Sequence, residues 1–481
     1  MKIQLIFAPP SDKVKLSDLV ENMYPPLGIL YLAAYLRKKL PQLELKITDG
    51  LLLGWDSSVS EIKAFGPDIL FISYLTPCAS SAYSLGKHTR EALPGVITVF
   101  GGPHATALPM EAFERGRADF VVVGEGEETS FELVKAILDK RSDLHQVKGL
   151  YWNSPNGVVQ NSPRQFIPDL DDIPFPAWDR IDMKPYKGWF AAKRTPDTSV
   201  LFARGCPFDC TFCTNCVWKS SKPWLRLRSP QNIADEVEYL KKDFGIREIF
   251  NNSDEFNCDV SHAAAVCREF KRRKLDVTWK AQLRAAPLPE GLVKEMAEAG
   301  CWYIHLGIES GNERTLKGIR KNITIKQVED ACRLLKKYHI KVFGLFMLFN
   351  AWEENGKLVF EGVEETKKTL EYARRLIDER LIDYMSSTIT TPYPGSQLFD
   401  IAERFGLIKP ELTEDWNRWL AEESFIMDLP GVDKKEAGRL YFYATILRSY
   451  CCLKSGNWSL KDLPLFFNKF AKAVIIRATG K

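Results

Sequence analysis

The stretch Cys206-Pro207-Phe208-Asp209-Cys210-Thr211-Phe212-Cys213 carries three cysteines in a C-x3-C-x2-C spacing. It follows an apolar run at residues 199–203 through the dipeptide Arg204-Gly205. Three thiolates on one short loop can surround a metal cluster and leave one metal corner without a protein ligand. Because a cluster of four irons usually takes four cysteines, this spacing predicts a fourth iron that binds a different molecule.

Two other interpretations of these cysteines are weaker. Structural zinc prefers four ligands, often in two separated C-x2-C pairs, and the only nearby fourth thiol is Cys216. Free cysteines also pack as small hydrophobic side chains, but Pro207 and Asp209 are typical of a loop. The spacing resembles that of the radical S-adenosylmethionine (SAM) superfamily.

The composition excludes several classes of partner. The chain has 481 residues, which predicts two or three domains, and its 66 basic and 62 acidic residues nearly balance. The sequence has no stripe of basic residues of the kind that binds nucleic acid. It also has no apolar segment long enough to span a bilayer. Eleven cysteines, an odd number, fit a reducing compartment. We therefore expect a cytoplasmic protein with no nucleic-acid partner and no transmembrane segment.

The first third of the chain alternates short apolar runs with helical patterns. Strands are expected at residues 3–8, 43–48, 69–73, 96–101 and 120–123, with the clearest helices at 27–39 and 81–92. This alternation is typical of a doubly wound, Rossmann-like parallel sheet. Ligands bind to such sheets beyond the carboxyl ends of the strands.

Glycine-rich loops follow two of these strands, as Gly101-Gly102-Pro103-His104 and Gly124-Glu125-Gly126-Glu127. Glycine lets the backbone approach a ligand closely, although ordinary tight turns also explain these residues. The first strand is followed by Pro9-Pro10-Ser11-Asp12, so the G-x-G-x-x-G dinucleotide fingerprint is absent there. The residues alone predict a ligand-binding parallel sheet.

The two loops and residues 24–33 resemble the cobalamin-binding domain that is fused to many radical SAM enzymes. The resemblance covers most of residues 1–140. It implies that cobalamin is lined by the glycines and acids of both loops, namely Gly101, Gly102, Gly124, Glu125, Gly126 and Glu127.

The histidine that classical cobalamin domains give to cobalt has no counterpart here. The D-x-H-x-x-G loop is missing after the first strand, and the nearest string, at residues 143–149, has one residue too many. We interpret its His145 as a surface loop residue. His104 is a candidate cofactor contact or, equally, an ordinary loop histidine. The loop at residues 73–79, which includes Thr76, is expected to face the lower side of the cobalt.

A second series of strands and helices begins near residue 199. Its strands are expected at residues 199–203, 248–252, 277–282, 302–308, 342–348 and 384–390, and helices at 231–242, 261–272, 325–337 and 362–377. Six units in about 200 residues are too few for a closed barrel of eight units, which needs ~250. They fit the partial (β/α)6 barrel of radical SAM enzymes.

Polar residues end several of these strands and are expected at the barrel mouth. They are Ser253-Asp254-Glu255, Gln282, Arg284, Glu309-Ser310 and Thr391. Such positions in a barrel are more often functional than outer-helix positions, although solvated loop charge explains Asp254 or Glu255 taken singly. By resemblance, Glu309 and Ser310 contact the nucleoside or amino acid part of SAM, and Arg284 is a candidate for its carboxylate.

The fifth strand departs from the family pattern. Relatives usually end it in a glycine-proline-glycine turn, whereas this chain reads Phe349-Asn350-Ala351-Trp352, and Trp352 is expected to cover part of the cleft. From about residue 409 the pattern is helical and aromatic. It predicts a small cap over the barrel mouth or, as a sharper idea, an apolar pocket for a lipid or tetrapyrrole. Cys216 stays undecided between a spare thiol and a residue on the substrate side.

Together these patterns predict an α/β chain with a cobalamin-binding domain at 1–150, a linker at 151–190, a partial barrel at 191–408 and a helical domain at 409–481. The resemblance implies a [4Fe–4S] cluster held by Cys206, Cys210 and Cys213, together with SAM and cobalamin. It implies methylation of an unactivated carbon in a small-molecule, lipid or peptide substrate, with an external reductant of the flavodoxin or ferredoxin type. Cyclisation, ring contraction or oxidation without net methylation is the first alternative, and a sensor without turnover is the second.

Overall fold

The structure is a computed structural model that describes residues 1–10, 22–186, 188–189, 191–419 and 425–456. The chain divides into two compact units. The first unit contains Met1–Cys206, Thr214–Ile246 and Glu414–Arg418, and the second contains Pro207–Cys213, Arg247–Thr413 and the residues from Trp419 onward. Among the described residues, no helix combines the length and the apolarity that crossing a bilayer requires.

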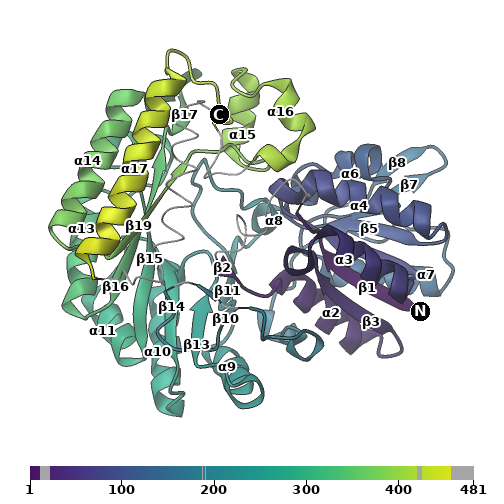
Figure 1. Cartoon of the computed structure of the whole chain (residues 1–481). Coiled ribbons are helices and arrows are strands. Elements are labelled where there is room, and N and C mark those ends of the chain that lie inside the picture. Colours follow the sequence, from purple (N-terminus) through teal and green to yellow (C-terminus); the bar gives the residue numbers. More distant parts are fainter. Residues whose placement is uncertain (11–21, 187, 190, 420–424, 457–481) are drawn as a thin grey trace. The chain divides into compact units, whose positions relative to one another are not determined.

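The first unit is built on a sheet in the order β3-β1-β4-β5-β6-β7-β8 (Figure 1). Its parallel strands lie where the periodicity predicts them; they are β1 (Lys2–Phe7), β3 (Glu44–Asp49), β4 (Ile69–Ser73), β5 (Ile97–Gly101) and β6 (Phe120–Val122). A hairpin of β7 (Leu150–Ser154) and β8 (Gly157–Gln160) adds two antiparallel strands at one edge. The doubly wound order places the carboxyl ends of β4, β5 and β6 side by side.

Helices cover both faces of this sheet. They are α2 (Leu27–Lys39), α3 (Gly50–Phe65), α4 (Ala79–Ala92), α5 (Pro103–Ala107), α6 (Pro109–Gly116) and α7 (Glu127–Leu138). Side chains alternate between the faces of a strand, so Ile3, Leu5 and Val99 share one face and pack in a core with apolar residues of α2 and α7.

The second half of the segment predicted as a linker, at residues 151–190, is irregular but well packed. Residues 161–178 contain only the short turn η2 (Leu170–Asp172) and lead to η3 (Trp178–Arg180). Trp178 is fully buried and donates from Nε1 to Oε1 of Glu236, at 3.0 Å, in α9 (Pro230–Phe244). The prolines at positions 168, 174 and 176 favour irregular backbone, and the buried Trp178 packs this backbone against α9.

The second unit contains parallel strands that follow one another in sequence order, each with a helix after it. The strands are β13 (Glu248–Asn251), β14 (Thr278–Leu283), β15 (Cys301–Glu309), β16 (Lys341–Leu348) and β19 (Tyr384–Ile389). The helices are α10 (Val260–Arg273), α11 (Glu290–Glu298), α13 (Ile325–Lys337) and α14 (Val363–Asp378) (Figure 1). This order agrees with the series of parallel strands and helices predicted from residue 248 onward.

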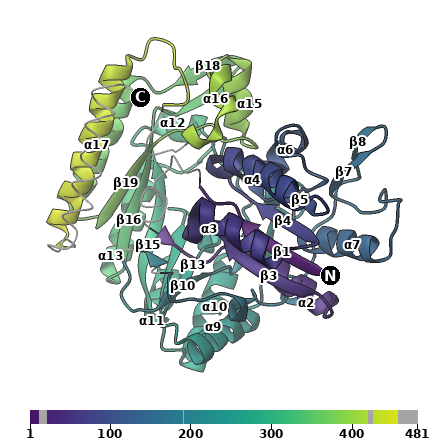
Figure 2. The same cartoon turned by 45° about the vertical axis from the view of Figure 1, so that its right-hand side comes forward.

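Three further helices follow β19. They are α15 (Gln397–Arg404), α16 (Pro410–Glu414) and α17 (Lys434–Lys454). In Figure 2, α17 (yellow) runs along the barrel wall, where it packs against α14 and β19. Lys454 in its last turn binds Asp378 of α14 at 2.7 Å. The expected aromatic residues beyond 456 lie outside the described residues.

The strand expected at residues 199–203 is divided. The structure has β10 (Asp197–Val200) and then β11 (Ala203–Gly205), which pairs antiparallel with β12 (Leu225–Leu227). The interruption redirects the chain just before Cys206, the first residue of the loop Cys206–Cys213, which is called the cluster loop below. An apolar run indicates that a strand is buried, but it does not indicate with which strand it pairs. The sequence pattern therefore did not predict this change of direction.

Candidate functional site

Hydrogen bonds within the second unit hold the part of the cluster loop at Pro207–Cys213. The backbone N–H of Thr211 donates to the carbonyl of Ile319 at 3.0 Å. Asp209 accepts hydrogen bonds from Arg320 at 3.0 Å and from Gln397 at 2.9 Å. These contacts fix the loop through Asp209 and Thr211. The Sγ of Cys210 also lies 3.6 Å from the carbonyl oxygen of Arg320.

All eleven cysteines of the chain lie in described residues, and none of them forms a disulfide there. Cys206 ends the path from β11 and is buried, Cys210 is half-buried and Cys213 is exposed. Burial raises the pKa of the Cys210 thiol, whereas the charges of Lys321 and Arg284 lower it. Thiolates are the ligands that iron–sulfur clusters take, and these nearby cations favour the thiolate form. The donor set therefore fits a cluster with three protein ligands.

Arg284 lies beside the cluster loop in the second unit. Its guanidinium stacks over the ring of Phe208, 4.0 Å from the ring centroid, and its backbone is held on both sides by the amide of Asn257. The side chain is buried, and its Nη1 has no hydrogen-bond partner among the described residues. An unsatisfied buried donor is costly, so this atom fits a carboxylate-bearing ligand.

Lys321 joins two of the expected mouth residues, and the sequence analysis missed it. Its Nζ lies 3.0 Å from Glu309 and 3.5 Å from Glu255. Burial alone lowers the pKa of Lys321, but the two carboxylates raise it above its ordinary value. Lys321 follows no strand and matches no motif that we used, so only the folded structure shows its place.

Ser310 faces a second buried network. Its hydroxyl donates to Oε1 of Glu361 at 2.7 Å and lies 3.0 Å from the hydroxyl of Thr369. The other carboxylate oxygen of Glu361 accepts from the side chain of Asn350 at 2.9 Å. Burial raises the pKa of Glu361. The structure thus brings Ser310 together with Glu361 and Asn350, and its contact with SAM stays a prediction.

The altered end of β16 is a sharp turn followed by a hairpin. Phe349 has a φ of 60°, and the chain continues into β17 (Ala351–Glu354) and β18 (Lys357–Phe360). Trp352 is buried against α12 (Glu313–Gly318), where a Cβ added at Gly318 would lie 2.2 Å from the indole. The expectation that Trp352 covers a cleft is therefore wrong, because the hairpin turns its side chain onto α12.

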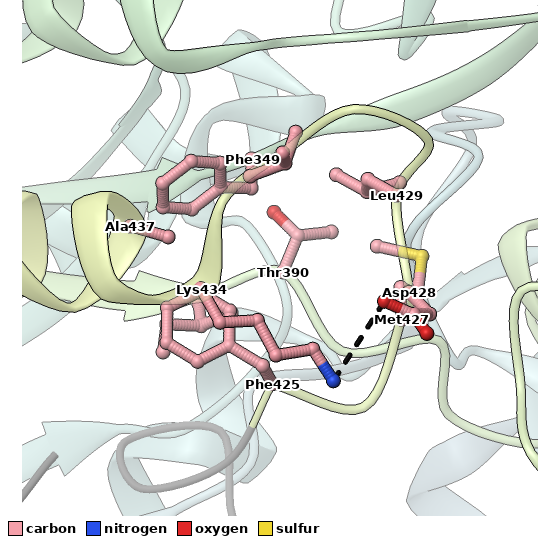
Figure 3. Close-up of a pocket in the computed structure, with 10 residues that line it drawn as sticks. Phe349, Thr390, Phe425, Met427, Asp428, Leu429, Lys434 and Ala437 are labelled. Atoms are coloured by element: carbon pink, nitrogen blue, oxygen red, sulfur yellow. Dashed lines mark ion pairs between the residues drawn. The ribbon is translucent and has the colours of Figure 1, made fainter. Parts of the chain in front are cut away.

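Phe349 instead packs against the segment before α17 (Figure 3). Its ring meets that of Phe425 edge-on, with centroids 5.7 Å apart. Apolar side chains that include Met427, Leu429 and Ala437 surround a cavity of about 20 Å³. This volume is of the order of one water, so this cavity does not provide the expected apolar pocket for a lipid or tetrapyrrole.

The first unit contains a larger cavity, of about 240 Å³, at the carboxyl ends of β4, β5 and β6. Both glycine loops line it, with Gly101, Gly102, Gly124, Glu125, Gly126 and Glu127 all at its wall. Gly102 has a φ of 100°, and a Cβ there would lie 3.0 Å from Ser73 Oγ and Tyr74 O. The lining is mostly apolar, and it includes Ser130, whose buried Oγ has no partner among the described residues. The cavity fits part of a large cofactor with polar groups.

His104 lies outside the lining of this cavity. Its Nδ1 is 3.0 Å from the hydroxyl of Thr76, and its Nε2 faces Glu111 at 3.6 Å. Trp416 packs edge-on against its ring at 4.8 Å. Burial lowers the pKa of His104, although Glu111 raises it. The structure therefore brings His104 and Thr76 together in a buried network. His145 is exposed, as predicted.

Cys216 begins α8 (Cys216–Lys219) in the first unit. Its Sγ lies 3.5 Å from the carbonyl of Pro103, next to the first glycine loop. Burial raises the pKa of this thiol to about 11, so Cys216 is protonated near neutral pH. Its environment is that of a packed thiol beside the cavity loop.

Comparisons with known proteins agree with this arrangement. The profile of the Radical SAM superfamily matches residues 200–355, and that of the B12 binding domain matches residues 16–134. An uncharacterized methyltransferase of Pyrococcus horikoshii is 35% identical over 87% of this chain and 86% of its own. The cytidylyl-2-hydroxyethylphosphonate methyltransferase of Streptomyces wedmorensis is 28% identical over 90% and 87%. The anaerobic magnesium-protoporphyrin IX monomethyl ester cyclase of Rubrivivax gelatinosus is 29% identical over 79% and 66%.

Two solved structures have the same fold. The cobalamin-dependent radical enzyme OxsB, with aqua-cobalamin and SAM bound, has a TM-score of 0.73 at 18% identity and covers 99% of this chain and 72% of its own. The methyltransferase TsrM of Kitasatospora setae, with cobalamin and a [4Fe–4S] cluster bound, has a TM-score of 0.61 at 19% identity over 85% and 79%.

Proposed function

The chain belongs to the radical SAM enzymes that carry a B12-binding domain, and from this premise we propose that it transfers a methyl group to an unactivated carbon of a small molecule. Its cofactors are a [4Fe–4S] cluster, SAM and cobalamin. The observation that carries methyl transfer is the 35% identity with a methyltransferase over 87% of the chain.

The proposed cluster ligands are Cys206, Cys210 and Cys213. Support comes from their spacing in the sequence and from the hydrogen bonds at Asp209 and Thr211, which hold the loop in place. The cations of Lys321 and Arg284 offset the negative charge of a thiolate at Cys210.

The proposed partner of the SAM carboxylate is Arg284. Its unsatisfied Nη1 is a buried donor, and the stack on Phe208 keeps the guanidinium in place. Glu309 is the proposed acceptor for a polar hydrogen of SAM, and Lys321 holds it in position. In the first unit, Gly102 and Gly124 let the backbone approach cobalamin closely, since both have a positive φ.

When bound, the cluster and SAM supply a 5′-deoxyadenosyl radical, and cobalamin supplies a methyl group drawn from another SAM. The chain's own contribution is to bind and orient these groups and to exclude water. An external one-electron reductant, of the flavodoxin or ferredoxin type, is the proposed electron source.

A second candidate function is ring closure without net methylation. The observation in its favour is the cyclase relative, which is 29% identical over 79% of the chain. The two functions differ in a measurable product, because methylation consumes SAM as a methyl donor and releases S-adenosylhomocysteine.

The deciding experiment is anaerobic turnover by the full chain, reconstituted with iron, sulfide and hydroxocobalamin and supplied with SAM, a one-electron reductant and candidate substrates. Mass spectrometry should find both 5′-deoxyadenosine and S-adenosylhomocysteine, with SAM-derived label in the product. Deoxyadenosine and a modified product without S-adenosylhomocysteine would replace the methyltransferase proposal by ring closure.

Cys210→Ala should abolish deoxyadenosine formation. Cys452→Ala is the matched control, because Cys452 is a half-buried thiol of α17, far along the chain from the cluster loop. If the loaded enzyme forms no deoxyadenosine with any candidate substrate, the sensor alternative is favoured instead.

A further inference from the structure

Four charged side chains form a buried network in the first unit. Arg204 of β11 lies directly opposite Arg226 of β12 in the antiparallel pair. Like charges in that relation repel, and here Glu125 lies between them. Arg204 donates to Glu125 at 2.8 Å, and Arg226 donates to both carboxylate oxygens of Glu125 at 2.7 and 2.9 Å. Arg204 also donates to Glu127 at 2.6 Å.

The network is balanced, with two cations and two anions, and all four side chains are at most 7% exposed. Burial alone raises the pKa of Glu125, but the two arginines hold it below its ordinary value. Removing one partner from such a set leaves an uncompensated buried charge. The positions of the two strands and of the loop Gly124–Glu127 are therefore mutually dependent.

The same network forms part of the wall of the 240 Å³ cavity. Glu125, Glu127 and Arg204 all line it. So do Tyr31 and Trp218, whose rings pack against the guanidinium of Arg204 at 4.9 and 5.5 Å. A ligand that fills the cavity must contact or displace this group of side chains.

Arg204 is also two residues before the cluster ligand Cys206, and the residue between them allows little adjustment. Gly205 has a φ of 87°, and a Cβ at this position would lie 2.0 Å from the carbonyl oxygen of Trp224. The backbone at Gly205 is therefore in close contact with Trp224, just before β12, and the side chain of Arg204 is bound to Glu125 and Glu127. A shift of Arg204 moves Cys206 with it.

We propose that Arg204 is a positioning residue that couples occupation of the cobalamin cavity to the geometry of the cluster ligand Cys206. Coupling between two binding sites is reciprocal, so the cluster also affects cobalamin affinity. The inference rests on the cluster and cobalamin as cofactors and is independent of whether a methyl group is transferred.

The test is a binding cycle on the full chain. Hydroxocobalamin is titrated into the protein before and after anaerobic cluster reconstitution, and the two dissociation constants are compared. We expect reconstitution to tighten cobalamin binding about fivefold or more, at the lower end of typical coupling. In the reduced protein, cobalamin should also change the electron paramagnetic resonance spectrum of the cluster.

Arg204→Lys keeps the charge but loses the two-pronged donor geometry of arginine, so the ratio of the two dissociation constants should fall towards one. A residue that only lined the cavity would change both constants equally and leave the ratio intact. Arg164→Lys is the matched control, since Arg164 pairs with Glu128 and Glu132 of the same helix α7, and neither of these acids lines the cavity.

Two results would overturn the proposal. One is a wild-type protein in which cluster reconstitution does not change the affinity for cobalamin and cobalamin does not change the spectrum of the cluster. The other is an Arg204→Lys variant that retains the wild-type ratio. If Arg204→Lys does not fold, Glu127→Gln serves instead, because its amide oxygen can still accept from Arg204 while one charge of the network is removed.

Discussion

Nζ of Lys321 lies 3.0 Å from Oε1 of Glu309, directly above the backbone of Gly307. A Cβ added at Gly307 would come within 2.6 Å of both atoms. Glu309 itself has a φ of 65°, a conformation that costs a non-glycine residue about 1–3 kcal/mol. The conformation at the end of β15 thus accommodates this ion pair. Both of its charges act on the Cys210 thiol, since Lys321 lowers the pKa of that thiol and Glu309 raises it.

Replacing Lys321 should lower the reduction potential of the cluster. Lys321→Met removes a buried positive charge that favours the reduced, more negative cluster. We expect a fall of roughly 60 mV, a tenfold change in a one-electron equilibrium, in a potentiometric titration followed by electron paramagnetic resonance. Lys317→Met, which removes an exposed lysine of α12, is the control. Equal potentials for wild type and Lys321→Met would contradict an electrostatic role.

Gly205→Ala should prevent normal cluster loading. The added methyl group would collide with the backbone oxygen of Trp224 at 2.0 Å, so β11 and β12 cannot keep their pairing. Gly245→Ala is the matched control, since Gly245 also has a positive φ but no atom within 4 Å of its Cβ position. We expect the control to lose about 1 kcal/mol of stability and to bind iron normally. An iron content for Gly205→Ala equal to that of the control would refute the steric argument.

His104→Asn should leave the absorption spectrum of bound cobalamin unchanged, because both ring nitrogens of His104 face protein groups outside the cavity wall. The variant should nevertheless lose about 2 kcal/mol of stability, since Thr76 and Glu111 lose a buried partner. Denaturant titration measures the second effect. A shift in the cobalt spectrum would show that His104 does reach the cofactor.

The protein should become less stable in acid, partly through His305. Burial lowers the pKa of His305 to about 3, while an unfolded chain titrates near 6.5. Below pH 6.5 the imidazole of His305 therefore binds a proton in the unfolded state but not in the folded state. The contribution of His305 to the free energy of unfolding falls with decreasing pH until about pH 3. Between pH 7.5 and 5.0 it amounts to about 2 kcal/mol.

The variant His305→Phe removes this titration and keeps an aromatic ring beside Phe250 and Phe343, whose centroids lie 5.0 and 5.1 Å from that of His305. Its free energy of unfolding should depend less steeply on pH over the same interval. An unchanged pH dependence would assign the acid sensitivity to other groups.

Periodicity located the regular elements well. The expected helix at residues 27–39 and the strand at residues 69–73 have the bounds of α2 and β4, because alternation of apolar residues directly reflects which face is buried. The spacing of Cys206, Cys210 and Cys213 could be recognised in the sequence because the three cysteines are close together in the chain itself; their role as cluster ligands stays a prediction.

Interactions between segments far apart in the sequence could not be found in this way. Lys321 forms an ion pair with Glu309 close to Gly307. Arg226 donates a hydrogen bond to Glu125, although 101 positions separate them in the sequence. Each side chain alone has the pattern of a solvated charge. The direction of Trp352 was mispredicted for the same reason, because it depends on the hairpin β17–β18 and on the small residue Gly318.

The first unit is made of separate stretches of chain, which limits how domains can be exchanged between this protein and its relatives. Arg204 and Arg226 lie in the stretch that matches the Radical SAM profile, yet their partner Glu125 lies in the stretch that matches the B12 binding profile. A cut in the linker would leave buried acids on one fragment and buried bases on the other. The B12-binding segment therefore cannot be exchanged on its own. A chimaera needs a junction beyond Ile246 and must also keep Glu414–Arg418, which belongs to the same compact unit.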